Sequence, residues 1–105
     1  QEVPKLMKEL LEWYLENKEL VHPAELAAKF HTKFTTIHPF ADGNGRMARL
    51  LMNYVLQKNT FPFTNIPLNR RNSYMKTQAA GNKKDHKPFV IFLSQEIIKQ
   101  NKKLV

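Results

Sequence analysis

Cysteine is absent from this sequence, and long apolar runs are absent as well. Without cysteine the chain can form no disulfide, use no thiol nucleophile and offer no thiolate to a metal. No stretch approaches the roughly 18 apolar residues that a membrane-spanning helix requires, and the first residues resemble neither a secretory nor a transit signal. We therefore expect a cytoplasmic protein that has no membrane partner.

Acidic residues are scarce, so the chain is strongly basic. It has 9 Asp and Glu residues against 17 Lys and Arg residues, which gives a formal net charge of +8. Two late clusters carry much of this excess and are interpreted as solvated helix ends: Lys83, Lys84 and Lys87, then Lys99, Lys102 and Lys103. Such a surface attracts acidic partners and polyanions. Because none of the motifs of nucleic-acid readers is present, we expect no specific nucleic-acid partner.

Apolar residues recur at helical spacing over most of the chain, which predicts an all-α fold. Helices are expected from Pro4 to about Asn17, Pro23 to Ile37, Arg46 to Lys58, Arg71 to Ala80 and Pro88 to Lys102. Residues 60–67 contain two prolines and predict an extended connector, and residues 81–87 predict a loop. Because 105 residues with 42% hydrophobic content support one modest core, we predict a single domain over residues 1–105, a compact bundle of about five helices.

The second and third expected helices have the clearest apolar stripes. In the second helix the residues expected to face inward are Leu26, Ala27, Phe30, Phe34 and Ile37. In the third helix the apolar residues at helical spacing are Met47, Leu50, Leu51, Tyr54 and Val55. The short segment between these helices would therefore be held by two core elements, which is a rigid support for a functional site.

That segment and the turn after it read HPFADGNGRMAR, from His38 to Arg49. Gly43 and Gly45 have no Cβ, so a bulky anion could approach the backbone N–H groups closely. The loop leads into a helix N-terminus, where unpaired N–H groups and the helix dipole favour phosphate. Arg46 and Arg49 lie on one helix face and could add forked hydrogen bonds to phosphate oxygens. The segment therefore predicts a phosphate-binding loop.

Two further side chains of the segment predict chemistry beside a bound phosphate. Asp42 is a hard oxygen ligand, and magnesium on phosphates usually takes only one or two protein carboxylates. His38 is the nearby side chain suited to accept a proton at neutral pH. A calcium loop is excluded, because the twelfth position counted from Asp42 is Asn53 where a bidentate Glu is needed. The other histidines show no metal-ligand spacing and are interpreted as surface or partly buried structural residues: His22, His31 and His86.

The segment resembles the signature of the Fic family, His-Pro-Phe-x-Asp/Glu-Gly-Asn-Gly/Lys-Arg-x-x-Arg, and matches it at every specified position. The likeness extends from EVPKLMKELLEWYL through HPAELAAKFHTKFTTI to RRNSYMKTQAAGNKKDHKPFVIFL. Fic proteins are helical enzymes that mostly transfer AMP from ATP to a hydroxyl group of a target protein. The resemblance therefore implies a protein adenylyltransferase with ATP as co-substrate, Mg²⁺ as cofactor and a protein target that presents a Ser, Thr or Tyr hydroxyl.

The resemblance also implies a role for each residue of the signature. His38 would be the general base for the attacking hydroxyl, and Asp42 would hold Mg²⁺ between the α- and β-phosphates. Arg46 would bind the leaving phosphates and Arg49 the γ-phosphate end. The anion-binding nest would consist of Gly43, Asn44 and Gly45. Glycine instead of lysine at the third nest position favours AMP transfer over phosphorylation.

A second family element predicts the adenine contacts. Fic proteins carry Arg-x-x-Tyr-Tyr, followed by Asn seven residues after the second Tyr, and Arg71, Tyr74 and Asn82 match this pattern. The position of the second Tyr is occupied by Met75. We therefore expect Tyr74, Met75 and Asn82 to line the adenine.

Two elements that Fic proteins usually carry have no counterpart in this sequence. A β-hairpin flap ordinarily precedes the first helix and pairs with the target as an added strand, whereas only three residues precede Pro4. The inhibitory helix of the family reads Ser/Thr-x-x-x-Glu-Gly/Asn, whereas Glu12 stands four residues before Glu16. We therefore expect the core of a longer protein, with inhibition supplied by a partner chain or an upstream segment.

Three alternatives to AMP transfer stay open at this point. The chain could be a regulatory or pseudo-enzyme module that holds nucleotide without turnover, or an enzyme that moves another phosphate-containing group. It could also be a basic interaction domain, whose polyanion binding would not depend on His38. Nucleotide turnover by the wild type and by a His38 variant would separate these alternatives.

Overall fold

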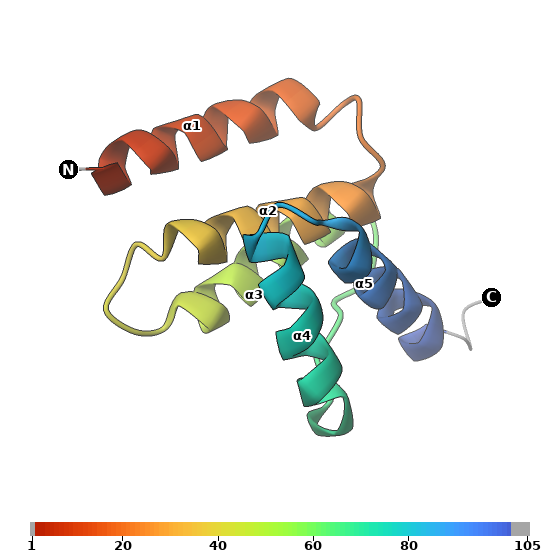
Figure 1. The fold of residues 1–105 in the computed structure, drawn as a ribbon. Coiled ribbons are helices and arrows are strands. Elements are labelled where there is room, and N and C mark those ends of the chain that lie inside the picture. The colour runs from red at the N-terminus through yellow and green to blue at the C-terminus, as the bar shows by residue number, and fades with distance from the viewer. Residues whose placement is uncertain (1, 102–105) are drawn as a thin grey trace.

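The computed structural model describes residues 2–101 and contains helices but no strand over that range. That range forms five α-helices, labelled in Figure 1, and one short 3₁₀ helix. Their bounds are α1 Glu2–Asn17, α2 Pro23–Ile37, α3 Asn44–Lys58, η1 Leu68–Arg70, α4 Arg71–Asn82 and α5 Lys87–Gln100. The predicted all-α fold of five helices is confirmed. None of the helices in this range is long and apolar enough to cross a bilayer.

Residues at its two ends explain where α2 begins and where it stops. Pro23 occupies its first turn, a position that tolerates proline because the missing N–H would have no helical partner. Before it, Nδ1 of His22 accepts a hydrogen bond from the backbone N–H of Ala24 at 3.1 Å. At the other end α2 stops at Ile37, before the His38–Pro39 pair, because proline disfavours helical geometry in the preceding residue. Both predicted bounds of α2 are therefore confirmed.

Several predicted boundaries differ from the structure by one or two residues, among them the starts of α1, at Glu2 instead of Pro4, and of α5, at Lys87 instead of Pro88. Helix α3 begins at Asn44, two residues before the predicted start. Helix α4 continues to Asn82, so that Gly81 and Asn82 are helical although they were predicted to lie in a loop. Helix α5 is observed to Gln100, and its predicted end at Lys102 lies outside the described residues. The 3₁₀ helix η1 was not predicted.

Helix α2 lies at the centre of the molecule and contacts α1, α3, α4 and α5. In Figure 1 it passes between α1 on one side and α4 on the other. The predicted inward face is confirmed, since these residues are buried or, for the last of them, half-buried: Leu26, Ala27, Phe30, Phe34 and Ile37. Burial of apolar area at about 25 cal/mol per Å² stabilises this arrangement. The C-terminal end of α2, which leads into the signature segment, is therefore firmly placed.

Helix α3 buries only part of its predicted apolar stripe: Val55 is buried and Leu51 packs against the core. Met47, Leu50 and Tyr54 are exposed to solvent. The other buried residues of the helix are Asn44, Ala48, Met52, Asn53 and Leu56. The helix itself was predicted correctly, but its sequence carries more apolar residues than its buried face uses.

The connector after α3 is extended, as predicted, and it is tied to two helices. Asn53 of α3 exchanges two hydrogen bonds with the backbone of Thr64, at 2.8 and 3.1 Å. Gln100 of α5 exchanges two with the backbone of Asn65, at 3.0 and 2.8 Å. Further along, Arg70 pairs with Glu96 at 3.0 Å. The connector therefore forms a fixed wall beside α3 and α4.

Candidate active site

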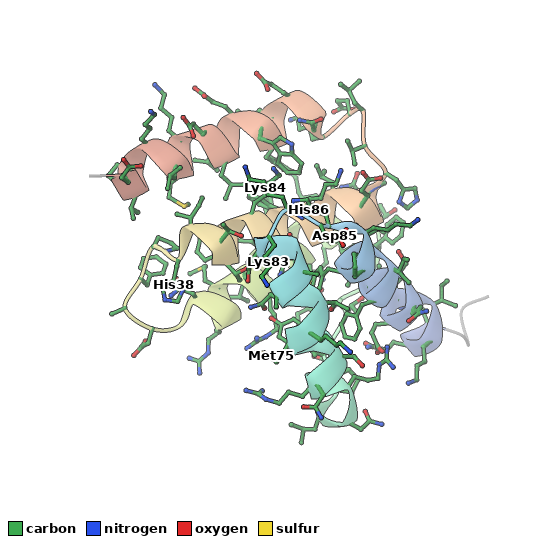
Figure 2. The ribbon with its side chains drawn as sticks, in the orientation of Figure 1. His38, Met75, Lys83, Lys84, Asp85 and His86 are labelled. Carbon is green, nitrogen blue, oxygen red and sulfur yellow. The ribbon has the colours of Figure 1, made fainter. Side chains whose placement is uncertain are left out.

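The loop between α2 and α3 carries the signature segment and projects beyond the ends of both helices (Figure 1). His38, the first residue after α2, has φ 54° and ψ 58°, and its N–H donates to the carbonyl of Phe34 at 3.0 Å. This left-handed conformation is uncommon for a residue other than glycine. It ends the helix and leaves the His38 side chain exposed in the loop, where Figure 2 labels it. The predicted base candidate is therefore accessible to a substrate.

Asn44 holds the loop in shape from within. Its Oδ1 accepts a hydrogen bond from the N–H of Phe40 at 3.0 Å, and its Nδ2 donates to the carbonyl of Phe40 at 2.8 Å. The Asn44 side chain is buried, and the Phe40 ring in turn contacts Phe34 with 6.2 Å between centroids. The Asn44 amide oxygen and one amide hydrogen are used inside the loop and the side chain is buried, so we assign any contact of Asn44 with an anion to its backbone N–H.

We expect Asn44→Ala to lower the free energy of unfolding by about 1 to 2 kcal/mol, since two hydrogen bonds to one backbone unit are lost. Urea unfolding measures this loss. Asn59→Ala is a matched control, because Asn59 caps the other end of α3 with a single bond to the carbonyl of Val55. A loss no larger than that of the control would show that the two hydrogen bonds from Asn44 to Phe40 do not stabilise the loop.

The first turn of α3 offers backbone N–H groups toward the loop. Gly43, with φ 82°, precedes the helix, and the first helical hydrogen bond joins Met47 N–H to the Gly43 carbonyl at 3.0 Å. The N–H groups of residues 44–46 therefore have no helical acceptor, as at every helix N-terminus. A Cβ at position 45 would lie 3.2 Å from Nη1 of Arg49, so glycine leaves room for the Arg49 guanidinium beside this turn. The arrangement fits an anion such as phosphate.

Asp42 and Arg46 extend from the same loop into solvent. Both are exposed, and within residues 2–101 neither takes part in an ion pair. No group of three or more His, Asp or Glu side chains in that range could hold a metal by itself. One carboxylate is enough for Mg²⁺ that is bound mainly through phosphates and water, so Asp42 fits that kind of site.

Arg49 points from α3 toward Tyr74 of α4. Its Nη1 donates to the Tyr74 hydroxyl at 3.2 Å, and its guanidinium lies 5.8 Å from the ring centroid. The same hydroxyl lies 2.8 Å from Nε2 of His31, which is fully buried in α2. Burial, and secondarily the charge of Arg49, lower the pKa of His31 to about 3. Burial raises the pKa of Tyr74, with Arg49 opposing the rise.

The interpretation of His31 as a surface or partly buried residue is therefore wrong. Its side chain has no exposed area and stacks on Phe89 with 4.5 Å between ring centroids. A signal was present in the sequence, because His31 follows Ala27 by four residues and precedes Phe34 by three on the inward face of α2. His86, by contrast, is partly exposed beside Thr32, as expected.

The three residues expected to line the adenine all lie on α4 but differ in their surroundings. Tyr74 is buried among aromatic rings, whereas Met75 is about half-exposed. Nδ2 of Asn82 donates to Oγ1 of Thr35 at 2.9 Å and to Oγ1 of Thr36 at 2.8 Å. Asn82 thus ties the end of α4 to the end of α2. The adenine contact itself stays a prediction.

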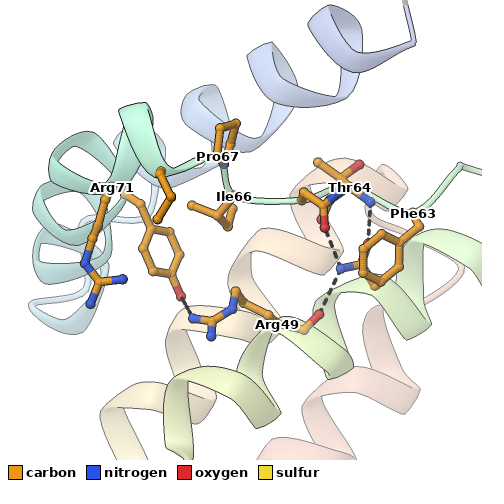
Figure 3. A pocket seen from close by; sticks show the side chains of 10 residues that line it. Arg49, Phe63, Thr64, Ile66, Pro67 and Arg71 are labelled. Atoms are coloured by element: carbon orange, nitrogen blue, oxygen red, sulfur yellow. Dashed lines mark hydrogen bonds between the residues drawn. The ribbon is translucent and has the colours of Figure 1, made fainter.

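A cavity of about 210 Å³ lies between α3, α4 and the connector. Figure 3 shows Arg49 and Arg71 at this cavity together with the connector residues. Tyr74 also lines it. Arg49 therefore lines the cavity and also lies close to the N-terminal turns of α3.

Figure 2 shows the basic residues Lys83 and Lys84 in the turn between α4 and α5, outside the loop that carries His38.

Comparison with known proteins agrees with the geometry of the loop. The Fic/DOC family matches residues 1–56. Protein adenylyltransferase Fic of Nematostella vectensis is 40% identical over 96 residues, which are 90% of this chain and 22% of that protein. Protein adenylyltransferase Fic of Drosophila yakuba is 41% identical over 90 residues, 85% of this chain and 18% of that protein. The chain therefore belongs to the Fic/DOC family.

Solved structures lead to the same fold. Fic-1 from C. elegans superposes with a TM-score of 0.89 at 32% identity, over 96% of this chain and 31% of that chain. A Fic domain containing signaling protein from Bacteroides thetaiotaomicron gives a TM-score of 0.85 at 35% identity, over 93% of this chain and 42% of that chain. The five helices are thus those of a Fic domain. The chain spans about a fifth of the length of the two curated relatives.

Proposed function

We propose that this protein transfers AMP from ATP to a Ser, Thr or Tyr hydroxyl of a protein target. The observation that supports this most strongly is the loop between α2 and α3, which presents the exposed His38 and Asp42 beside the open N-terminus of α3. The names of the curated relatives, protein adenylyltransferases, agree with it. In the reaction the hydroxyl oxygen bonds to the α-phosphorus, the bond from that phosphorus to the bridging oxygen breaks, and pyrophosphate leaves.

The residues of the loop divide this task among them. His38 accepts the proton of the attacking hydroxyl, which raises the nucleophilicity of its oxygen. The N–H groups of residues 44–46 and the side chain of Arg46 bind the phosphates, and Arg49 binds the γ-phosphate end. Asp42 would hold Mg²⁺, which would supply charge neutralisation for the leaving phosphates. The adenine lies along α4 near Tyr74, Met75 and Asn82.

Arg49 is also where we expect inhibition to act. Within residues 2–101 its guanidinium makes one hydrogen bond, to Tyr74, although it carries five donors. A carboxylate from a partner chain or an upstream segment could take the remaining donors and exclude the γ-phosphate. Such a regulator competes with ATP but has no direct contact with His38.

The test follows the α-phosphate and the γ-phosphate of ATP separately. The protein is incubated with cell lysate and ATP that is labelled on either the α- or the γ-phosphate, with Mg²⁺ or with a chelator. We expect covalent label on protein only from the α-labelled nucleotide, and none after removal of the metal. Transfer of the γ-label would indicate phosphorylation, and ATP binding without covalent label from either position would indicate a regulatory module.

A further inference from the structure

We propose that the buried pair His31 and Tyr74 positions Arg49 for the distal phosphates of ATP. This inference rests on the proposed function and adds two positioning residues to it. The Tyr74 hydroxyl stands between the other two groups, 3.2 Å from Nη1 of Arg49 and 2.8 Å from Nε2 of His31. The three side chains come from α4, α3 and α2, so the contact joins the helices on which the site is built.

The chemistry of the groups fixes the direction of the bond between Arg49 and Tyr74, and the tautomer of His31 sets the direction of the other. A guanidinium only donates, so the Tyr74 oxygen accepts from Arg49. We assign the single hydroxyl proton to the bond with Nε2 of His31, which is the direction that the inference requires. Burial lowers the pKa of His31 to about 3, so the ring is neutral at physiological pH and one nitrogen can accept. With Nε2 as the acceptor, the ring proton of His31 is on Nδ1.

Nδ1 of His31 is buried and has no hydrogen-bond partner among the described residues. A buried polar atom without a partner destabilises the fold, and such atoms are rare in folded proteins. An apolar side chain would fill this position without that penalty. However, an apolar side chain could not accept a hydrogen bond from the Tyr74 hydroxyl, as His31 can. We infer that His31 directs this proton away from Arg49, so that the hydroxyl oxygen presents a lone pair to the guanidinium.

Both rings of the pair are rigidly held. His31 stacks on Phe89 at 4.5 Å, and Tyr74 contacts Phe89 and Phe92 with centroids 5.9 and 6.2 Å apart. The Tyr74 hydroxyl is therefore a fixed point in the core. The bond to it restrains the long side chain of Arg49 beside the open turn at Gly45, where a Cβ would lie 3.2 Å from Nη1. A side chain that is ordered before binding loses less entropy when the ligand arrives.

Tyr74→Phe in the full chain tests the inference, because it removes the hydroxyl and keeps the ring. In nucleotide-free protein, NMR of the Arg49 side-chain N–H groups should show signals that are resolved in the wild type and averaged by rotation in the variant. In calorimetry with Mg-ATP and with AMP, the Kd for ATP should rise about 2- to 10-fold, the equivalent of one lost hydrogen bond, and the Kd for AMP should stay unchanged.

Tyr14→Phe is the matched control. The Tyr14 ring stacks on Phe30 at 5.1 Å, and its hydroxyl forms no hydrogen bond within residues 2–101. We expect neither the Arg49 signals nor either Kd to change in this variant. A second test uses His31→Gln, which keeps an acceptor near Nε2, and His31→Leu, which removes it. His31→Leu should resemble Tyr74→Phe, while His31→Gln should retain most of the ATP affinity, with thermal unfolding used to confirm that each variant is folded.

The double variant Tyr74→Phe/Arg49→Met shows whether the effect passes through Arg49. Its ATP affinity should equal that of Arg49→Met alone. Additive losses, unchanged Arg49 signals in Tyr74→Phe, or equal weakening of ATP and AMP would each overturn the inference, the last by assigning the Tyr74 hydroxyl, and not only the retained ring, to the adenine. A wild type whose Arg49 signals are resolved but which binds no ATP would overturn the proposed function, while the ordering of Arg49 by Tyr74 would stand.

Discussion

We expect His38→Ala to lower the rate of AMP transfer by about 10² to 10⁴, while the affinity for Mg-ATP stays within a few-fold. His38 is exposed at the end of α2, and only its backbone takes part in the helix cap. The substitution therefore removes a proton acceptor and little else. Single-turnover transfer measured beside calorimetry of Mg-ATP binding separates the chemical step from nucleotide affinity.

The left-handed backbone of His38 suggests His38→Asn as a matched variant. Asparagine adopts this conformation more readily than most residues, so the loop should keep its shape without the imidazole. Both variants should lose transfer to a similar degree. Transfer that survives in His38→Asn but not in His38→Ala would assign the effect to loop geometry, and transfer that survives in both would exclude His38 as the base.

The second large effect is expected from Arg46→Ala. Arg46 is exposed in the first turn of α3 and has no ion-pair partner among the residues seen. Loss of one charged hydrogen bond of about 1.5 to 3 kcal/mol corresponds to roughly 10- to 150-fold weaker Mg-ATP binding. AMP lacks the phosphates that Arg46 is proposed to bind, so its affinity should fall less.

Lys58→Ala controls for the general effect of charge in that experiment. Lys58 is exposed in the last turn of the same helix, so its removal changes the net charge by the same amount at the opposite end. Calorimetry should show near wild-type binding of ATP for this control. Equal losses of ATP and AMP affinity in Arg46→Ala would indicate that Arg46 supports the fold instead of the phosphates.

Apolar spacing and the placement of proline and glycine predicted the helices well, and side-chain contacts account for two of the boundaries that were missed. The bounds of α2 follow from prolines at both ends. The start of α3 was placed two residues late because an Asn–Gly pair usually marks a turn, whereas Asn44 is held at the helix start by its bonds to Phe40. The end of α4 was placed early because of Gly81. In the structure a Cβ there would lie 2.8 Å from Cγ2 of Thr32, so glycine serves the contact between α4 and α2.

The candidate site shows the same division between local and distant information. The loop from His38 to Arg46 could be predicted because its residues are contiguous and each has a chemical reason to be there. The contact of Tyr74 with His31 joins residues 43 positions apart, and that of Asn82 with Thr36 joins residues 46 positions apart. Such pairs depend on how the helices pack, and spacing within one helix does not contain that information.

The buried ring of His31 makes the folded protein sensitive to acid. The pKa of His31 is lowered from 6.5 to about 3, so between these values the unfolded chain takes up a proton that the folded chain excludes. The stability from this residue is fully present above about pH 6.5 and decreases as the pH falls toward 3. A decline of activity on acidification would then combine altered chemistry with a growing unfolded fraction. A pH–rate profile of this protein in that range therefore becomes a measurement of catalysis only after division by the fraction folded at each pH.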